Sequence, residues 1–406
     1  MTRRRRILLV TPFAPAADGR HGGARAVHGL ACELVERHDV VLLHLDRDEL
    51  DPAIAARCRA VHAIPIADAG PWAVRARGAA GVVRGRSLKA AASAVPALRR
   101  RARDLAELTS PDVVQVEFGI LGDVLAAVSG ALRVVTIHDP AASLGEGQAL
   151  RRDGLPFAHR LDARAALREE RRVLRAADGA VVFTERDRGL VARSAPAGMA
   201  LATIGLGWDV PAVALDPVGT SPPTLLFVGG YRHPPNVAAA LALAQRILPT
   251  VRARHPDVRL ELVGGSPPRE LLALAGEAIF VPGEVASVTP YLDRAAVVVA
   301  PITLGGGMRV KVLEALAAGK AVVASTRAAE GIGARAGEEI AIADGDAATA
   351  QAISRLLADP GARRRMAGRA REWALRELSW SAMADSYDEL YARLDHQRAE
   401  RPAVAR

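Results

Sequence analysis

The segment PITLGGGMRVKVLEALAAGKAVVAST, residues 301–326, decides the fold that we predict for this chain. It follows the apolar run AAVVVA at 295–300, which is typical of a strand buried on both faces. Three consecutive glycines form a turn, and residues 308–318 have the small, apolar pattern of a helix that packs on a sheet. Another apolar run follows at 321–324. A strand, a glycine turn, a helix and a strand in this order predict one βαβ unit of a parallel sheet.

The glycine turn predicts a binding site for a nucleoside diphosphate. Glycines lack a Cβ, so backbone N–H groups can come close to an anion, and the N-terminus of the next helix adds partial positive charge. Lys311 and Glu314 are three residues apart and therefore share one face of that helix. The lysine can neutralise phosphate oxygens, and the glutamate can accept hydrogen bonds from ribose hydroxyls. The pattern leaves one alternative open, a plain glycine turn beside a solvated Lys311–Glu314 ion pair.

Short β-branched runs alternate with amphipathic stretches along the chain, which predicts parallel sheets covered by helices. Strands are predicted at 7–11, 40–45, 61–66, 113–117, 134–138, 180–183, 224–228, 259–263, 278–281, 297–300, 321–324 and 340–343. Helices are predicted at 24–37, 88–107, 159–177, 236–247, 269–275, 308–318 and 347–358. The sequence therefore predicts an α/β protein with two Rossmann-like, doubly wound parallel-sheet domains that face a cleft.

The domain boundaries follow from breaks in this alternation. Residues 204–223 are rich in Gly and Pro without a helical period, which is typical of a linker, so we predict domains at 1–205 and 206–375. From Pro360 the pattern is helical, with a break near Leu378 and Ser379. We expect a C-terminal helix at 376–397 that crosses back to the first domain and a disordered tail at 398–406.

Length and composition indicate a globular protein with two cores: 406 residues, half of them apolar and a quarter charged. Basic residues exceed acidic ones by 54 to 45, which favours anionic partners. Aromatic residues make up only 3% of the chain, so nucleic acid is not an expected partner. Lysine occurs only at 89, 311 and 320, which makes the lysine in the glycine segment noticeable. Cys32 and Cys58 lie far apart, which fits a reducing compartment.

The N-terminus resembles a signal peptide, but its apolar run covers only Ile7–Val10 before Thr11 and Pro12, so we predict a first strand instead. No window approaches the roughly 18 apolar residues that span a bilayer. The basic stretch 72–103, together with Arg3–Arg6, favours contact with an anionic membrane surface. We therefore expect a cytoplasmic protein that can bind peripherally to the inner face of the membrane.

The segment 301–326 resembles the donor-nucleotide signature of glycosyltransferases with the two-Rossmann GT-B fold, in particular the large retaining family four. LLFVGGYRHPPN at 225–236 and FVPGEVASVTPYLDRAAVVVAP at 280–301 resemble other parts of that family's nucleotide-binding domain. In the first half, TIHDP at 136–140 resembles the family's His-bearing loop. One position departs from the pattern: Gly306 stands where the family often has a glutamate that contacts the donor sugar, which leaves the anchor of the sugar open.

The residues singled out by pattern or by resemblance lie at the carboxyl ends of predicted strands, in the loops that follow or in the first turns of the next helix. They are His138, Arg232 and Lys311 for catalysis; Gly22, Gly23, Gly283, Val285, Gly305, Gly306, Gly307 and Glu314 for donor binding; and Glu117 and Asp139 on the acceptor side.

The resemblance implies different contacts for the residues outside the glycine turn. His138 would contact the donor sugar, and Arg232 would join Lys311 at the diphosphate. Glu117 would orient an acceptor hydroxyl, and the base would meet backbone groups near 283–285. Gly22 and Gly23 could let the first helix approach a phosphate or the acceptor, although a plain helix start fits them equally well.

The predicted function is sugar transfer from a nucleotide-diphosphate sugar to a hydroxyl of a glycan, a lipid-linked sugar or a small glycoside. The family implies retention at the anomeric carbon, and the predicted reaction requires no metal and no cofactor. Two alternatives stay open: a catalytically silent scaffold in polysaccharide assembly and a non-hydrolysing sugar-nucleotide epimerase. A nicotinamide oxidoreductase is least favoured because the G-x-G-x-x-G fingerprint is missing. The base, the donor sugar, the acceptor and the oligomeric state are not predicted.

Overall fold

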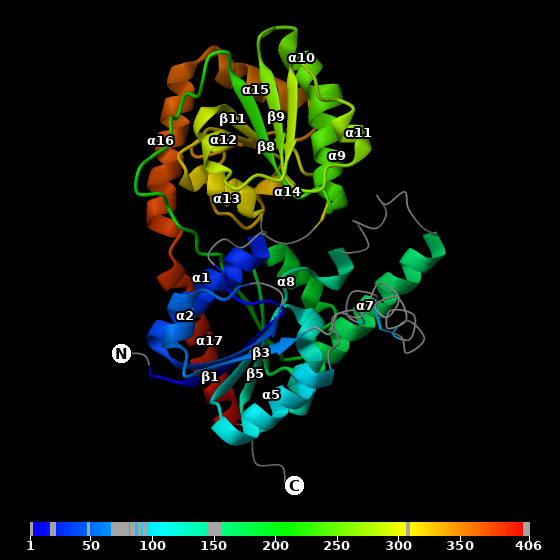
Figure 1. Ribbon diagram of the computed structural model, residues 1–406, viewed down its shortest axis with the longest axis vertical. Coiled ribbons are helices and arrows are strands. Elements are labelled where there is room, and N and C mark those ends of the chain that lie inside the picture. Colours follow the sequence, from blue (N-terminus) through cyan, green and yellow to red (C-terminus); the bar gives the residue numbers. More distant parts are fainter. Residues whose placement is uncertain are drawn as a thin grey trace. The chain divides into compact units, whose positions relative to one another are not determined.

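The computed structural model describes residues 3–16, 22–46, 49–65, 81, 86, 87, 91, 96–143, 156–305 and 309–400. These residues form two compact units. The first contains the described parts of 1–145, 153–207 and 380–406, and the second contains 208–379. Figure 1 shows helices on both faces of the sheet in each unit.

The first unit is a seven-stranded sheet in which every neighbouring pair is parallel. Its strand order, β3-β2-β1-β4-β5-β6-β7, is that of a doubly wound fold. The elements are β1 (Arg6–Thr11), α1 (Gly22–Arg37), β2 (Asp39–Asp46), α2 (Pro52–Arg57), β3 (Ala60–Pro65), α5 (Pro96–Thr109), β4 (Val113–Glu117), the 3₁₀ helix η1 (Gly119–Ala127), β5 (Leu132–Thr136), α7 (Pro156–Ala176), β6 (Gly179–Val182), α8 (Glu185–Ala192), β7 (Ala200–Thr203) and α17 (Trp380–Glu400).

The second unit repeats this plan with a parallel six-stranded sheet in the order β10-β9-β8-β11-β12-β13. The elements are β8 (Thr224–Val228), α9 (Pro234–Ala242), the π-helix η2 (Leu243–Ile247), α10 (Leu248–Arg252), β9 (Arg259–Val263), α11 (Arg269–Leu272), β10 (Ile279–Gly283), α12 (Thr289–Arg294), β11 (Ala295–Ala300), α13 (Val310–Ala317), β12 (Val322–Ala324), α14 (Thr326–Ala329), β13 (Ala341–Ile342), α15 (Asp346–Ala358) and α16 (Pro360–Glu377).

The predicted α/β fold with two parallel, doubly wound sheets is confirmed. In both units the strand order reverses between two central strands, β1 and β4 in one and β8 and β11 in the other. Ligands of such sheets bind at the carboxyl ends of the strands where the order reverses. The topology therefore marks two places to search, one in each unit.

Strand β7 was missing from the sequence prediction because its residues, ALAT, carry only one β-branched side chain. Strand β5 ends at Thr136, so His138 lies in the loop after the strand and not at its last position. The helix predicted at 236–247 continues to Arg252 through η2 and α10. Of the helix predicted at 88–107, positions 88–90 and 92–95 lie outside the described residues, and α5 forms the part from Pro96 onward.

Helix α17 belongs to the first unit although it follows the second unit in sequence. It packs against α1 and β5 and buries Met383, Tyr387, Leu390 and Tyr391. Asp395 of α17 pairs with Arg5 of the first unit at 2.6 Å. The helical break expected at Leu378 and Ser379 is present, while residues 398–400, expected to be disordered, continue α17.

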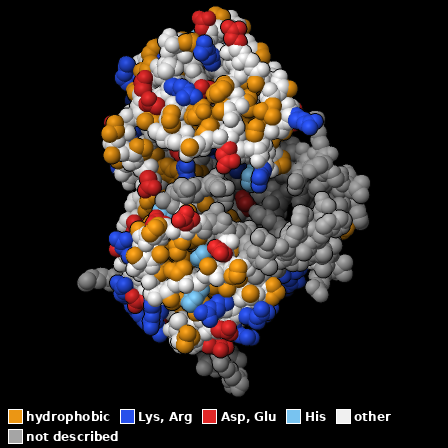
Figure 2. Space-filling model, in the orientation of Figure 1, with side chains coloured by type: hydrophobic (Ala, Val, Ile, Leu, Met, Phe, Trp, Pro, Cys, Tyr) orange, Lys and Arg blue, Asp and Glu red, His pale blue; other side chains and the backbone are white. Residues whose placement is uncertain are grey.

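Charged side chains of both signs are interspersed on the face shown in Figure 2. Arg3 and Arg6 both pair with Asp112, Arg4 pairs with Asp39, and Arg5 pairs with Asp395, so the N-terminal arginines have carboxylate partners. Of the basic stretch 72–103, only 81, 86, 87, 91 and 96–103 are described. Among the described residues, no helix is both long and apolar enough to cross a bilayer.

Candidate active site

The glycine segment of the second unit follows β11, at the place where the strand order reverses. Gly305 has a φ of +94°, a backbone conformation that side chains disfavour, and a Cβ there would lie 3.4 Å from the Pro235 ring. Gly306 and Gly307 lie outside the described residues. Helix α13 begins at Val310 without a side-chain hydrogen bond from the preceding Arg309 to its first turn. The segment thus joins a strand end to the N-terminus of a helix, as the sequence predicted.

Lys311 of α13 reaches the carboxyl end of the neighbouring strand β8. Its Nζ donates a 2.7 Å hydrogen bond to Asn236 Oδ1 and lies 4.5 Å from the centre of the Phe227 ring. Burial, together with the charge of Arg309, lowers the pKa of Lys311 to about 7. Lys311 therefore has a readily populated neutral form near pH 7, and an anion placed beside Nζ would favour its protonated form.

Glycines make room for this amino group. A Cβ on Gly229, directly after β8, would lie 2.6 Å from Lys311 Nζ and 2.9 Å from Asn236 Cγ. Gly264, directly after β9, has a φ of +151°, and a Cβ there would overlap the Gly229 carbonyl group. Gly264 is therefore required by close approach to the backbone, whereas a Cβ on Gly229 would need the end of the Lys311 side chain to move. Neither glycine was singled out from the sequence.

The other predicted donor residues of this unit surround the same strand ends. Arg232 is exposed and donates from Nε to Ser266 Oγ at 3.1 Å, which links the loops after β8 and β9. Gly283 ends β10, and its carbonyl accepts from Gly264 N at 2.9 Å. Glu314 is half-buried one turn beyond Lys311, and Val285 is half-buried after β10.

Arg309 stands between the glycine segment and α13. Its guanidinium donates to the Leu304 carbonyl at 3.2 Å and would lie 3.2 Å from a Cβ on Gly305. The arginine thus holds the backbone of the segment while its charge disfavours the charged form of Lys311.

The first unit places Glu117 and His138 together at the carboxyl ends of β4 and β5. Glu117 Oε2 lies 2.9 Å from His138 Nε2, and the histidine ring stacks on Phe118 with a centroid distance of 3.7 Å and an interplanar angle of 3°. Phe118 has a φ of +69°, which is strained for a residue with a side chain. The strained backbone therefore sits beneath the predicted sugar-binding histidine.

The acceptor contact that the sequence predicted for Glu117 does not fit the structure. Only 1% of Glu117 is exposed, and its carboxylate already accepts from Gln115, Thr136 and His138. A carboxylate that is this deeply buried offers no oxygen at the surface to a substrate hydroxyl. The prediction for Glu117 failed because the last residue of a strand can point into the core as readily as toward a ligand. Asp139, by contrast, is exposed.

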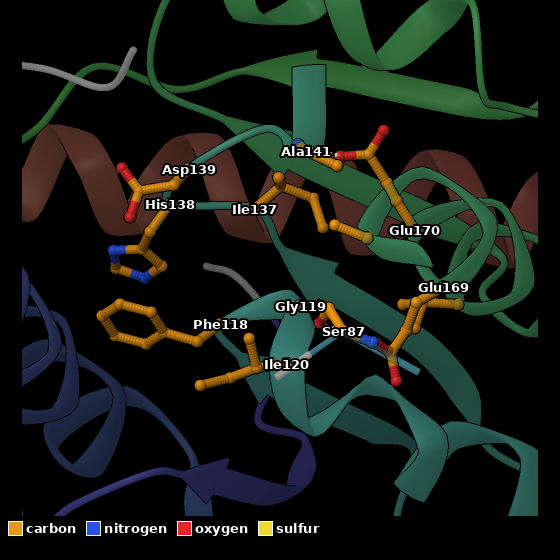
Figure 3. A pocket seen from close by; sticks show the side chains of 12 residues that line it. Ser87, Phe118, Gly119, Ile120, Ile137, His138, Asp139, Ala141, Glu169 and Glu170 are labelled. Atoms are coloured by element: carbon orange, nitrogen blue, oxygen red, sulfur yellow. Dashed lines mark hydrogen bonds between the residues drawn. The ribbon is translucent and has the colours of Figure 1, made fainter. Parts of the chain in front are cut away.

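A pocket opens beside His138 between η1 and α7, with an empty volume of about 580 Å³ that includes space open to solvent. Figure 3 shows His138 and Phe118 on one side, Glu169 and Glu170 on the other, and Ile137 between them. The pocket combines an apolar floor with carboxyl groups, which suits a ligand that is part apolar and part hydroxylated.

The two glutamates of α7 are held differently. Glu169 accepts from Arg86 Nε at 2.9 Å and from Ser87 Oγ at 3.1 Å. Glu170 Oε2 accepts from Ala141 N at 2.7 Å, and its other oxygen is buried without a partner among the described residues. Burial raises the pKa of Glu170 despite the bond from Ala141. Protonation of Glu170 would remove the cost of burying a charged carboxylate at this position.

Gly22 and Gly23 are the first residues of α1, and both are half-buried. The loop before them, 17–21, lies outside the described residues. Their place at a helix start fits both a plain helix start and a helix that approaches a phosphate or the acceptor.

The family described as Glycosyl transferases group 1 matches residues 222–359. The whole chain is similar in structure to sucrose-phosphate synthase from Thermosynechococcus elongatus, with 20% identity, a TM-score of 0.68 and coverage of 97% of this chain and 100% of that one. It is also similar to trehalose 6-phosphate synthase from Burkholderia multivorans, with 15% identity, a TM-score of 0.63 and full coverage of both chains.

A third similar structure is HepE from Anabaena in complex with UDP and glucose, with 14% identity, a TM-score of 0.63 and coverage of 96% of this chain and 100% of that one. Among curated proteins, no sequence matches this chain. At these identities the structural similarity concerns the fold, whereas the family match concerns the sequence of the second unit. Residues 222–359 thus match the glycosyl transferases group 1 family, which agrees with the predicted resemblance.

Proposed function

We propose that this GT-B protein, a glycosyltransferase whose second unit is a group 1 domain, transfers a sugar from a nucleotide-diphosphate sugar to an acceptor hydroxyl. One observation carries the proposal: a partly desolvated lysine amino group lies at the strand ends beside a glycine segment and a helix N-terminus. Each of these three features favours a phosphate group. HepE, a protein of the same fold, has been seen with UDP and glucose, which supports this assignment.

The second unit would bind the nucleotide diphosphate. Lys311 and the backbone of the Gly305 segment would receive the phosphates, with Arg232 as a second cation at the same strand ends. Glu314 would accept from the ribose, and the backbone near Gly283 would meet the base. Cations of the chain itself can neutralise the diphosphate, so we propose a reaction that does not depend on a metal.

The first unit would hold the sugar and the acceptor. His138 would accept or donate a hydrogen bond at a sugar hydroxyl, and the pocket between η1 and α7 would take the acceptor. The pocket's apolar floor favours a glycoside with an apolar part, such as a lipid-linked sugar. Such an acceptor would place the enzyme at the inner face of the membrane during polysaccharide assembly.

In the reaction, the bond between the anomeric carbon and the diphosphate oxygen breaks, and the acceptor oxygen forms the new bond to that carbon. The proton of the acceptor hydroxyl passes to the departing diphosphate. Lys311 and the backbone amides would stabilise the negative charge that develops on the leaving group. We propose retention at the anomeric carbon, with departure and attack on the same face of the sugar.

The experiment is a thermal-unfolding screen with nucleoside diphosphates and their sugars, comparing wild type with Lys311→Met. Methionine keeps an unbranched apolar side chain while removing the charge that lies over the Phe227 ring. A ligand at 100 times its Kd stabilises by about 2.7 kcal/mol. We expect one base to shift wild type and to shift Lys311→Met much less.

A matched control is Arg246→Gln, which removes an exposed cation of the same unit that pairs with Asp346. It should keep the full ligand shift. A wild type that responds to no nucleotide would instead favour a catalytically silent scaffold, and a donor sugar that is converted without acceptor to its epimer would favour an epimerase.

A further inference from the structure

The carboxylate of Glu117 is the centre of a buried hydrogen-bond network in the first unit. Its Oε1 accepts from Gln115 Nε2 at 2.7 Å and from Thr136 Oγ1 at 2.8 Å. Its Oε2 takes the remaining contact, His138 Nε2 at 2.9 Å. The ionised carboxylate has room for all three donors, because it accepts at both oxygens and donates at neither.

Two branches of the network lead to the C-terminal helix α17. The hydroxyls of Tyr387 and Thr136 lie 3.1 Å apart, and the Tyr391 hydroxyl contacts Gln115 Oε1. These two tyrosines are one helical turn apart, so they face the sheet together. The network therefore runs from the last helix of the chain, through two strands, to the predicted sugar-binding histidine.

Counting protons gives the direction of each bond. Thr136 has a single hydroxyl proton, which goes to Glu117, so Tyr387 must donate to Thr136. Gln115 gives its N–H to Glu117, so its amide oxygen must receive the proton of Tyr391. Tyr387 thus holds the Thr136 hydroxyl, and Tyr391 holds the Gln115 amide, in the orientation in which each donates to Glu117.

Burial keeps this arrangement in one protonation state. Gln115, Thr136, Tyr387 and Tyr391 are fully buried. Burial, and next the charge of Glu117, raises the pKa of both tyrosines well above the usual value, so both hydroxyls stay protonated and can only act as described. An alternative arrangement would leave a buried polar group without a partner.

We propose that Tyr387 and Tyr391 are positioning residues that hold Glu117 and thereby set the orientation and the tautomer of His138. Glu117 accepts from Nε2, so the neutral ring carries its proton there and presents Nδ1 as an acceptor for a hydroxyl. The stack on Phe118 fixes the plane of the ring. The link to sugar transfer rests on the proposed function, while the effect on the tautomer does not.

The test is ¹⁵N NMR of histidine side chains in the full chain, with His138→Gln used to identify the His138 signals. Wild type should show a protonated Nε2 and an unprotonated Nδ1. Tyr387→Phe and Tyr391→Phe keep the packed rings but remove one hydroxyl each. In either variant we expect His138 to populate both tautomers, and the double variant should show the larger change.

Asp388→Asn is the matched control. Asp388 lies between the two tyrosines on α17 and pairs with His38 at 2.9 Å, so the change loosens the helix without removing a hydroxyl of the network. It should leave the His138 signals as in wild type. Thermal unfolding of each variant identifies any that fail to fold. If the double variant fails to fold, the two single tyrosine variants still decide the test.

The proposal is overturned if His138 keeps a single wild-type tautomer in both tyrosine variants, or if wild type carries its proton on Nδ1. Transfer assays then give the catalytic consequence: roughly a tenfold loss of kcat per lost hydroxyl, the effect of one hydrogen bond, with the KM for the acceptor unchanged. An inactive wild type would count against the proposed function but would leave the NMR result to stand alone.

Discussion

The two units share one strand order yet fill the ends of their central strands in opposite ways. In the second unit, Gly229, Gly264 and Gly305 leave the strand ends without side chains, so that Lys311, the Gly229 backbone and Arg309 come close to the main chain there. In the first, Phe13 and Phe118 pack edge to face at a centroid distance of 5.5 Å, and His138 stacks on Phe118. The same topology thus provides a site where backbone can approach a ligand and a site shaped by side chains.

The difference teaches that topology sets the place of a site and residue size sets its ligand. Phosphate is recognised by many short N–H contacts, which glycine permits because nothing covers the backbone. A sugar hydroxyl needs one or two oriented side-chain partners, and the buried network behind His138 supplies such an orientation. The charges at the strand ends differ as well: Lys311 brings a cation to them in the second unit, and Glu117 places a buried carboxylate at them in the first.

The comparison is most strongly tested by adding a single methyl group at Gly229, directly after β8. In Gly229→Ala the new Cβ would displace the side-chain ends of Lys311 and Asn236, so the free energy of unfolding should fall by about 1 kcal/mol, the low end of the cost of overpacking. Displacement of the cation should weaken nucleotide binding by at least roughly tenfold, the effect of one charge-assisted hydrogen bond. Calorimetric titration and thermal unfolding measure the two quantities.

The adjacent Gly230 provides the control, because a Cβ there would meet nothing within 4 Å. Gly230→Ala should bind nucleotide as wild type does. Equal losses in both variants would mean that Gly229 acts through general backbone flexibility and not through room for Lys311.

A smaller effect is expected at Glu170 in the pocket of the first unit. Its carboxyl has a raised pKa, so the folded state holds a proton that the unfolded state releases, and stability falls as pH rises from the unfolded pKa near 4.5 through the folded value. Glu170→Gln mimics the protonated form and should remove this loss, raising the free energy of unfolding above neutral pH by up to about 1 kcal/mol.

Glu169→Gln is the matched change on the same helix. It weakens the ion pair with Arg86 and the bond from Ser87, so it should destabilise the protein at neutral pH. Denaturant unfolding at pH 5 and pH 8 separates the two variants. A Glu170→Gln protein that is less stable than wild type at pH 8 would contradict the claim that burial disfavours the ionised carboxyl.

The fold could be predicted because buried parallel strands leave long β-branched runs, such as VVQVE and AAVVVA, between helical patterns. Strand β7 escaped because an edge strand of small residues carries no such run. The donor site could be predicted because a lysine is rare in this chain and follows three glycines. Asn236, which holds that lysine, gave no signal, since an Asn near a helix start usually has a local role.

The network in the first unit could not be predicted for a different reason. Tyr387 and Tyr391 have the spacing of a helix face that enters a core, and both are buried. Their hydroxyl partners are some 250 residues or more away in the chain, with separations of 251 for Thr136 and 276 for Gln115. Only the docking of α17 on the sheet reveals what their polar ends do.

The most direct test of the central claim is a proton count during nucleotide binding at pH 8, by calorimetry in two buffers with different ionisation enthalpies. Free Lys311 has a pKa of about 7 and is mostly neutral at this pH, so it must take up a proton before it pairs with a diphosphate. We predict an uptake approaching one proton per site in wild type, an affinity that falls as pH rises above 7, and no such uptake in Lys311→Met. Equal uptake in both proteins, or binding that strengthens with pH, would contradict the assignment of Lys311 to the diphosphate.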